Sequence, residues 1–379
     1  MRLRRSSTNH DLKARAPGGY SVQPRAREFR RLSLGLVLLV GIACAPAGGS
    51  YGGPPPNRLR ADSAEVKTDV AEPDTPLTYI SEGTRPGIGN CPIYPRNNVF
   101  HADISRLPVR EGSASTIAAV GADLPLGVGF YSAVWQGSRG GVPVNVVDST
   151  TTEPVDVIGD TYSYLSDLED HPIPPNPKIE GHPGIAWDKH MIVFDTATCV
   201  SSEFFYVTPP NFLFDRWVAA TAVKLDLSSN SIRERGSAIA SGMSMLALMV
   251  RYEEVRSGEI DHMLQIALPV IANTAPVWPA SDTDGRSESP DAPPMGTVFR
   301  LRSDVDLSGF SPDALTIARA LQDHGAVLGD TGPSLGIAGE NDPRWDDGAL
   351  RDLQNLHLSD FEVVDVSPMM VSDASYEIR

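Results

Sequence analysis

The sequence predicts a mainly β fold, a sandwich or barrel with a few peripheral helices, and an α+β fold is the alternative. Two observations support this prediction. Segments rich in β-branched and aromatic residues are numerous, short and bounded by turn residues. Helical signals are few, and only one segment carries a full set of them. Many short strands with a few helices at the edge are typical of sandwiches and barrels.

The predicted strands follow one another along the chain from residue 126. They cover residues 126–135, 142–147, 154–158, 190–195, 200–207, 217–227, 262–269 and 297–302. Residues 190–195 and 200–207 flank the short segment Thr196-Ala-Thr-Cys199, and this spacing predicts a hairpin.

The clearest helical signal covers residues 311–324. Ser311 can cap the N-terminus, Pro312 suits the first helical position, and Asp313 favours the positive end of the helix dipole. Gly325 would end the helix. Weaker helices are predicted at residues 113–120, 239–252 and 348–356.

The first 43 residues have the layout of a secretory signal peptide. They carry nine arginine or lysine residues against Asp11 and Glu28, and they end in an apolar run of about ten residues. A helix that spans a bilayer needs about 20 residues. Three outcomes stay open: lipidation of Cys44 in the lipobox-like Gly41-Ile-Ala-Cys44, cleavage after Ala45-Pro-Ala47, or an uncleaved anchor.

Glycine, proline and charged residues dominate the segment that follows. Its composition cannot bury enough apolar surface to fold, so we expect a signal peptide at 1–43, a disordered tether at 44–85 and one globular β-rich domain at 86–379. Removing the signal's net +7 from the chain's −16 leaves −23. This charge argues against nucleic acid as a partner and leaves contact with a membrane to the N-terminal anchor.

The three cysteines predict a disulfide. If Cys44 is lipidated or removed, Cys91 and Cys199 remain as a pair, and an exported chain favours their oxidation. Such a bond would close a loop of over a hundred residues and contribute about 4–5 kcal/mol in the chain-entropy model. The alternative is two separate buried thiols.

Several blocks of the chain resemble a functionally uncharacterised family of secreted bacterial proteins. Cys91-Pro-Ile-Tyr-Pro-Arg-Asn-Asn98 is similar to its C-P-I-F-P-x-x-N opening. The other similar blocks are residues 172–181 (P-I-P-P), 187–190 (D-R-H), 225–230, 249–262 (R-Y-x-E-V), 293–296 (P-P-M-G) and 342–347. Lys189 replaces the family's arginine, and Met243–Met245 replace a proline-rich turn. The resemblance implies an extracellular setting and one continuous domain, but no mechanism.

Common catalytic signatures are absent from the sequence. It has no G-x-S-x-G, H-E-x-x-H, C-x-x-C or P-loop motif, and Gly127-Val-Gly129 lacks the rest of a dinucleotide fingerprint. Asp282-Thr-Asp-Gly285 begins like a calcium loop but lacks the glutamate at the twelfth position, so an exposed acidic turn is favoured and no cofactor is predicted.

Five residues are candidates for acid–base chemistry. Asp188 and His190 lie two apart, so on a strand they would share one face, where a carboxylate can orient an imidazole or both can bind a metal. Asp226 ends a predicted strand and could be a general acid or base. Glu254 and His262 flank Gly258 in the densest polar segment. For each, a purely structural role as a turn, cap or solvated charge is the alternative.

Four further residues are candidates for binding a sugar. Arg251 and Tyr252 suit a polysaccharide lyase, in which an arginine neutralises the carboxylate of a uronate. Trp187 and Trp345 lie in polar segments and are predicted at the surface, whereas Trp217 is predicted in the core.

These features predict an exported, lipid-anchored protein that binds or cleaves extracellular polysaccharide, as a glycoside hydrolase or a polysaccharide lyase. The alternative is a non-catalytic surface, adhesion or structural lipoprotein, whose polar residues are only turns and caps.

Overall fold

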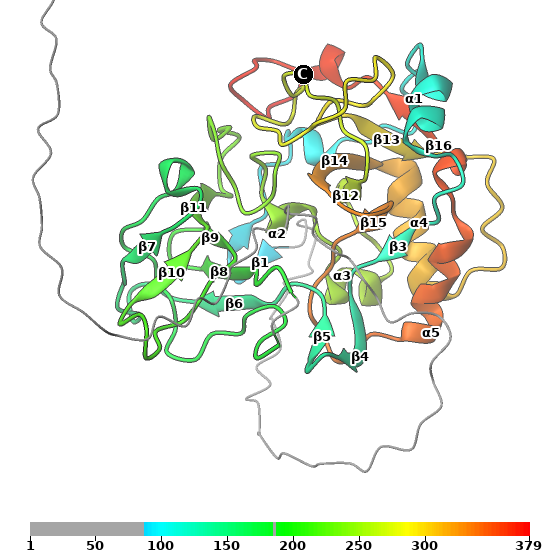
Figure 1. The fold of residues 1–379 in the computed structure, drawn as a ribbon. Coiled ribbons are helices and arrows are strands. Elements are labelled where there is room, and N and C mark those ends of the chain that lie inside the picture. Colours follow the sequence, from blue (N-terminus) through cyan, green and yellow to red (C-terminus); the bar gives the residue numbers. More distant parts are fainter. Residues whose placement is uncertain (1–86, 185–186) are drawn as a thin grey trace, which may run out of the picture. The chain divides into compact units, whose positions relative to one another are not determined.

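The computed structural model describes residues 87–184 and 187–379 (Figure 1). The predicted signal peptide, the tether and Cys44 lie outside these residues. The described part is mostly β, with several sheets, one of them curled into a half-barrel, and with short helices. This agrees with the fold class that the sequence predicts.

The strands are short, as the sequence predicts. They are β1 Gly87–Ile88, β2 Cys91–Pro92, β3 Gly127–Val128, β4 Tyr131–Trp135, β5 Ser138–Gly140, β6 Val144–Val147, β7 Val157–Gly159, β8 Met191–Asp195, β9 Val200–Phe205, β10 Trp217–Ala219, β11 Thr221–Asp226, β12 Leu264–Leu268, β13 Val298–Leu301, β14 Ala326–Thr331, β15 Gly336–Ile337 and β16 Phe361–Val364. The α-helices are α1 Ser113–Val120, α2 Met245–Leu248, α3 Tyr252–Ser257, α4 Pro312–Asp323 and α5 Asp347–Leu350.

A four-stranded sheet has the order β11-β9-β8-β6, in which only β6 and β8 run parallel. Both faces of its central strand β8 are buried. Met191 and Val193 contribute to one apolar cluster, and Ile192 and Phe194 contribute to another, as the two-residue period of a strand requires. A strand that is apolar at every position therefore lies in the middle of this sheet.

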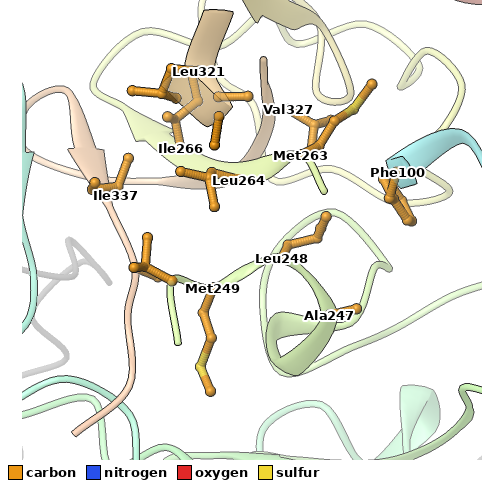
Figure 2. Packing of buried hydrophobic residues seen from close by; sticks show 14 of the residues in the cluster. Phe100, Ala247, Leu248, Met249, Met263, Leu264, Ile266, Leu321, Val327 and Ile337 are labelled. Carbon is orange, nitrogen blue, oxygen red and sulfur yellow. The ribbon is translucent and has the colours of Figure 1, made fainter. Parts of the chain in front are cut away.

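A six-stranded mixed sheet has the order β16-β13-β14-β12-β15-β3. Its central strands β12 and β14 run parallel, and α4 lies between them in sequence and packs against β13. Figure 2 shows buried side chains of α2, β12, β14, β15 and α4 gathered in one core, among them Leu248, Leu264, Val327, Ile337 and Leu321. The same cluster contains residues of the four-stranded sheet, so both sheets share a core.

The predicted hairpin and disulfide are both present. β8 and β9 pair in antiparallel register from Asp195–Val200 outward and leave a four-residue loop between them. Cys199 ends that loop with a φ of 59°, and its sulfur is bonded to that of Cys91. The bond joins the hairpin to β2, which lies 108 residues earlier in the chain. A disulfide of this kind indicates an oxidising compartment.

The predicted helix at residues 311–324 is also present. Ser311 occupies the N-cap position of α4 and Pro312 its first turn, and Gly325 follows the C-cap with a φ of 73°. The hydroxyl of Ser311 donates to the carbonyl oxygen of Ala349 and makes no cap hydrogen bond.

The helix predicted at residues 239–252 is wrong. Gly242 has a φ of 80°, and the chain becomes helical only in the four-residue α2, which Ser244 caps. Met249 is extended, so α3 begins as a separate helix. The apolar run carries no helical periodicity, because the side chains from Met243 to Val250 are all buried.

Candidate functional site

Asp188 and His190 lie where the chain enters β8. Each contributes to the electrostatic environment of the other. β8 begins only at Met191, and Lys189 has a φ of 57°. This segment is therefore not an extended strand, and the alternation that predicted one shared face does not apply there. Instead, Lys189 adopts a left-handed backbone conformation between Asp188 and His190.

His190 is a buried cation. Its Nδ1 lies 2.8 Å from Oε2 of Glu180, and its Nε2 lies 3.1 Å from the carbonyl oxygen of Ala238. Both partners accept hydrogen bonds, so both ring nitrogens donate and the imidazole is charged. Burial alone would lower the pKa of His190, but the charge of Glu180 and the hydrogen bond to it raise the pKa to about 9. Neither ring nitrogen is left for a substrate.

The carboxylate of Asp188 makes no hydrogen bond within the described part of the chain, although the residue is partly buried. Burial raises its pKa above the usual range, and the neighbouring charge of His190 only partly offsets this. Because Asp188 is half-buried and lacks a donor, its carboxylate is free to accept a hydrogen bond from a ligand.

Asp330 is a third carboxyl group beside His190, and the sequence analysis missed it. It lies at the C-terminal end of β14, where the register with β12 shifts after Ile266–Leu328 to Ala267–Asp330. The extra residue is Gly329, so a bulge sets the direction of the next side chain.

The environment of Asp330 favours its protonated form. Oδ1 accepts hydrogen bonds from the backbone N–H of Thr331 at 2.9 Å and of Ala240 at 3.4 Å. Burial raises the pKa of Asp330 to about 7, although His190 opposes this shift. Glu180, Asp188, His190 and Asp330 are called the acidic site below. It brings together segments far apart in sequence, before β8 and after β14.

Aromatic rings border the acidic site. Trp187 precedes Asp188 and meets Trp135 of β4 edge to face, with 5.6 Å between ring centroids. Tyr206 follows β9, and its backbone N–H donates to the carbonyl oxygen of Asp188 at 3.0 Å. The side chain of Tyr206 is 54% exposed. These aromatic residues therefore belong to the segments that carry or adjoin Asp188, and Tyr206 offers exposed aromatic surface there.

Two buried polar groups near the acidic site have no hydrogen-bond partner among the described residues. They are the hydroxyl of Tyr131 and the indole Nε1 of Trp187. Burial raises the pKa of Tyr131 to about 12, and the charges of Glu180 and Asp347 add to this shift. The phenol therefore stays protonated and can donate a hydrogen bond at neutral pH. An orphaned donor of this kind marks a place where a ligand or water can bind.

The loop after Tyr206 presents an apolar tip. Phe212, Leu213 and Phe214 are 95%, 69% and 42% exposed. The side chain of Asn211 holds the turn, because its Oδ1 accepts from the N–H groups of Leu213 and Phe214. The apolar side chains are therefore displayed on a hydrogen-bonded loop that starts at the edge of the acidic site.

Arg251, Glu254 and His262 form a separate cluster, called the buried triad below. Glu254 accepts hydrogen bonds from Arg251 Nη2 and, at 3.2 Å, from His262 Nε2, and all three side chains are at most 2% exposed. Burial alone would raise the pKa of Glu254, but Arg251 and His262 hold it below its usual range. Glu254 therefore has both of its partners in the interior, and none of the three side chains reaches solvent.

The acidic site and the buried triad lie at opposite ends of β12 and β14. Leu264 pairs with Ala326 and Leu268 with Thr331. His262 precedes Leu264, whereas Asp330 belongs to the other end, which is roughly 13 Å away at about 3.3 Å per residue. The structure therefore does not bring His190 and His262 together.

Asp226 is also apart from both clusters. It is exposed at the end of β11, and its Oδ1 accepts from the N–H of Ser228 at 2.9 Å and from its hydroxyl at 2.6 Å. This is an Asx turn, the structural alternative considered for it.

Trp345, predicted at the surface, is buried at 3% exposure, and this prediction is wrong. Its indole N–H donates to the carbonyl oxygen of Glu340 at 2.8 Å, and its ring packs on Tyr252 and Phe130. The other face of Tyr252 lies 4.0 Å from the guanidinium of Arg344. Trp217 is half-buried against the second apolar cluster.

Metal binding finds no support in the described residues, since no three His, Cys, Asp or Glu side chains among them are grouped to hold an ion. The carboxylates of the calcium-like turn have other partners. Asp282 accepts from the N–H of Gly236, and Asp284 accepts from the hydroxyl of Thr331.

Comparisons with protein-family models, with curated proteins and with solved structures find no match for this chain. The resemblance to a secreted family therefore stays a prediction. Within the described residues, no helix has the length and apolarity that crossing a bilayer requires.

Proposed function

We propose that this protein binds and cleaves an extracellular polysaccharide at the acidic site. The observation that carries the proposal is the pair of carboxyl groups, Asp188 and Asp330, whose pKa values are both raised beside one buried imidazolium. Carboxyl groups with raised pKa values are typical of active sites, including those of glycosidases.

The two carboxyl groups suit different steps of glycoside hydrolysis. Asp330, with a pKa of about 7, holds a proton in a large fraction of molecules at neutral pH and can protonate the oxygen of the leaving sugar. Asp188 has no hydrogen-bond donor in the described chain and can activate water or attack the sugar. His190 is a positioning residue, because both of its ring nitrogens are engaged.

The aromatic surface supplies the remaining requirement of a sugar site. Trp187, which contacts Trp135, precedes Asp188 in the chain, and the backbone of Tyr206 is bonded to that of Asp188. The loop that carries Phe212, Leu213 and Phe214 follows Tyr206. Pyranose rings stack their apolar faces on such side chains. The lyase form of the proposal has less support, because Arg251 is used inside the buried triad.

The proposed location is the outside of the cell. The disulfide between Cys91 and Cys199 supports an oxidising compartment, and the basic and apolar N-terminus supports export. We propose a lipid anchor at Cys44, with cleavage after Ala47 as the alternative.

A non-catalytic surface protein is the second candidate, and one observation favours it. Glu254 pairs with Arg251 and His262 in the interior, and Asp226 caps a turn. These four nominated residues therefore have complete structural explanations.

The test is the release of reducing ends from a panel of neutral, amino and uronate polysaccharides. We expect Asp330→Asn and Asp188→Asn each to lower kcat by roughly 10²-fold or more, as loss of an acid or base does. The matched control is Asp226→Asn, which should retain full activity. Glycan binding without turnover on any polymer would support the non-catalytic candidate instead.

A further inference from the structure

A cavity of about 290 Å³ lies on one face of the four-stranded sheet. Lys224 of β11 and Ser202 of β9 line it, and they are paired across the two strands, so their side chains lie on the same face. None of the described residues that line the cavity belongs to the acidic site or to the buried triad. The cavity is therefore a separate place in the fold where a small molecule can bind.

Lys224 brings an unpaired cation to this cavity. Its side chain is half-buried, and its ammonium group makes neither a hydrogen bond nor an ion pair within the described part of the chain. Burial lowers the pKa of the neighbouring His171, and the charge of Lys224 adds to this shift. The imidazole therefore stays neutral at neutral pH, and Lys224 is the one cation among the described residues that line the cavity.

Asp170 brings an unpaired carboxylate to the same cavity. Among the described residues, no donor or cation is bonded to this carboxylate, and Lys224 does not pair with it either. The backbone of Asp170 has a φ of 57°, and its N–H donates to Oδ1 of Asp156 at 3.2 Å. Two opposite charges therefore line one cavity without pairing, which leaves both of them available to a ligand.

Asp195 is the other carboxylate of the cavity, and hydrogen bonds from its own loop occupy it. Oδ1 accepts from the N–H groups of Ser149 at 2.9 Å and of Ala197 at 3.1 Å, and Oδ2 accepts from the hydroxyl of Thr198. Burial alone would raise the pKa of Asp195, but these hydrogen bonds lower it, so the group is ionised. A ligand that is only an anion would meet repulsion here, and one that is only a cation would leave Lys224 unpaired.

The cavity also has apolar walls. Pro154, Pro172 and Val200 line it, and their carbon atoms suit an aliphatic group. The hydroxyl of Thr152 also lines the cavity, has no partner in the part of the chain that the structure describes, and can donate a hydrogen bond. A small ligand with one positive group, one negative group and an aliphatic portion matches these features.

We propose that this cavity binds a free α-amino acid with an aliphatic side chain. The ligand's carboxylate binds the ammonium group of Lys224 and the hydroxyl of Thr152, and its ammonium group binds the carboxylate of Asp170. Its side chain packs against the apolar walls. Because no residue of the acidic site takes part, this inference stands independently of the proposed glycan function.

The experiment is calorimetry at neutral pH on the full-length chain with three ligands of similar shape. They are leucine, isocaproate, which lacks the amino group, and isoamylamine, which lacks the carboxylate. We expect leucine to bind at least roughly tenfold more tightly than either analogue, because each analogue leaves one charge of the cavity unpaired. Absence of leucine binding would overturn the inference, and so would an analogue that binds as tightly as leucine.

Three variants locate the binding. Lys224→Met keeps a long side chain but removes the charge, so it should weaken leucine at least roughly tenfold and leave isoamylamine unchanged. Asp170→Asn should weaken leucine to a similar extent and leave isocaproate unchanged, and it tests the site even if Lys224→Met does not fold. The matched control is Lys178→Met, which removes the charge of an exposed lysine outside the cavity and should change no affinity. Full leucine affinity in both cavity variants, or an equal loss in the control, would overturn the inference.

Discussion

Asp330 gives the sharpest physical prediction, because its environment opposes its charge. Its pKa rises from 3.8 to about 7 in the folded protein. A group whose folded pKa is raised contributes stability below its unfolded pKa and loses that contribution as pH rises through the folded value. Glu340, whose burial raises its pKa to about 7, and His190, at about 9, act in the same direction. The contribution of these three groups to the free energy of unfolding should therefore fall from about pH 4 to about pH 8. His171, His182 and His324, whose pKa values burial lowers, act in the opposite direction below about pH 6.5.

Asp330→Asn should remove part of this loss. A shift of about 3 pKa units corresponds to about 4 kcal/mol, and partial solvent exposure of the residue reduces this to roughly 2 kcal/mol. Asparagine keeps an oxygen that can accept from the N–H groups of Thr331 and Ala240, as the protonated acid does. We therefore expect the variant to be more stable than the wild type by about 2 kcal/mol near pH 8 and nearly equal near pH 4.

Urea unfolding of both proteins at the two pH values measures this difference. Asp226→Asn is the matched control with the opposite sign, because hydrogen bonds from Ser228 outweigh burial and lower the pKa of Asp226. The ionised Asp226 therefore stabilises the fold above its unfolded pKa, and this stabilisation is lost as pH falls. Asp226→Asn should for this reason be no more stable than the wild type near pH 8. A wild type that is as stable as Asp330→Asn, or more stable, near pH 8 would refute the reasoning. So would an Asp330→Asn variant that is destabilised equally at both pH values.

Three further predictions follow from the core. Glu254→Gln leaves Arg251 and His262 without their buried carboxylate, so urea unfolding should show a free energy of unfolding lower by about 3–5 kcal/mol. A decrease below about 1 kcal/mol would contradict the burial of the Arg251–Glu254 ion pair. Cys199→Ser should lower the free energy of unfolding by roughly 4–5 kcal/mol. A thiol titration of the oxidised wild type would contradict the disulfide if it found Cys91 and Cys199 both free. Trp345→Ala should lower the free energy of unfolding by about 3–5 kcal/mol, and the molecules that remain folded should bind glycan with unchanged affinity. A variant that kept its stability but lost glycan binding would show instead that Trp345 contacts the glycan.

The hairpin, helix α4 and the disulfide could be predicted from the sequence. The hairpin of β8 and β9 follows from two apolar runs around a four-residue loop, and α4 follows from Ser311, Pro312 and Gly325. The disulfide follows from cysteine counting in an exported chain. Each of these predictions needs only neighbouring residues or the compartment, so no knowledge of long-range pairing was required.

The positions of Asp330 and Glu180 beside His190 could not be predicted, because they depend on pairing between strands and segments that are far apart in the sequence. Asp330 reaches His190 because β14 pairs in parallel with β12 and a bulge at Gly329 shifts the register. Strand pairing across some sixty residues leaves no local pattern, although Gly329 between an apolar strand and an acid is a weak signal of a bulge. Glu180 lies in a resemblance block, yet only its backbone pairing with His190 reveals its role.

The contrast between the two charged clusters locates the chemistry better than either cluster alone. In the buried triad, Glu254 lies between Arg251 and His262, and Arg251 also donates to the carbonyl oxygen of Leu246. In the acidic site, three carboxyl groups share one imidazolium, Asp188 has no donor in the described chain, and the pKa values of Asp188 and Asp330 rise. A fold selected for stability alone would replace Asp330 by an uncharged residue, because its charge is unfavourable at neutral pH. Stabilisation by Asp330→Asn together with loss of glycan cleavage would therefore identify a functional carboxyl group, whereas stabilisation with no functional loss would assign Asp330 to the scaffold.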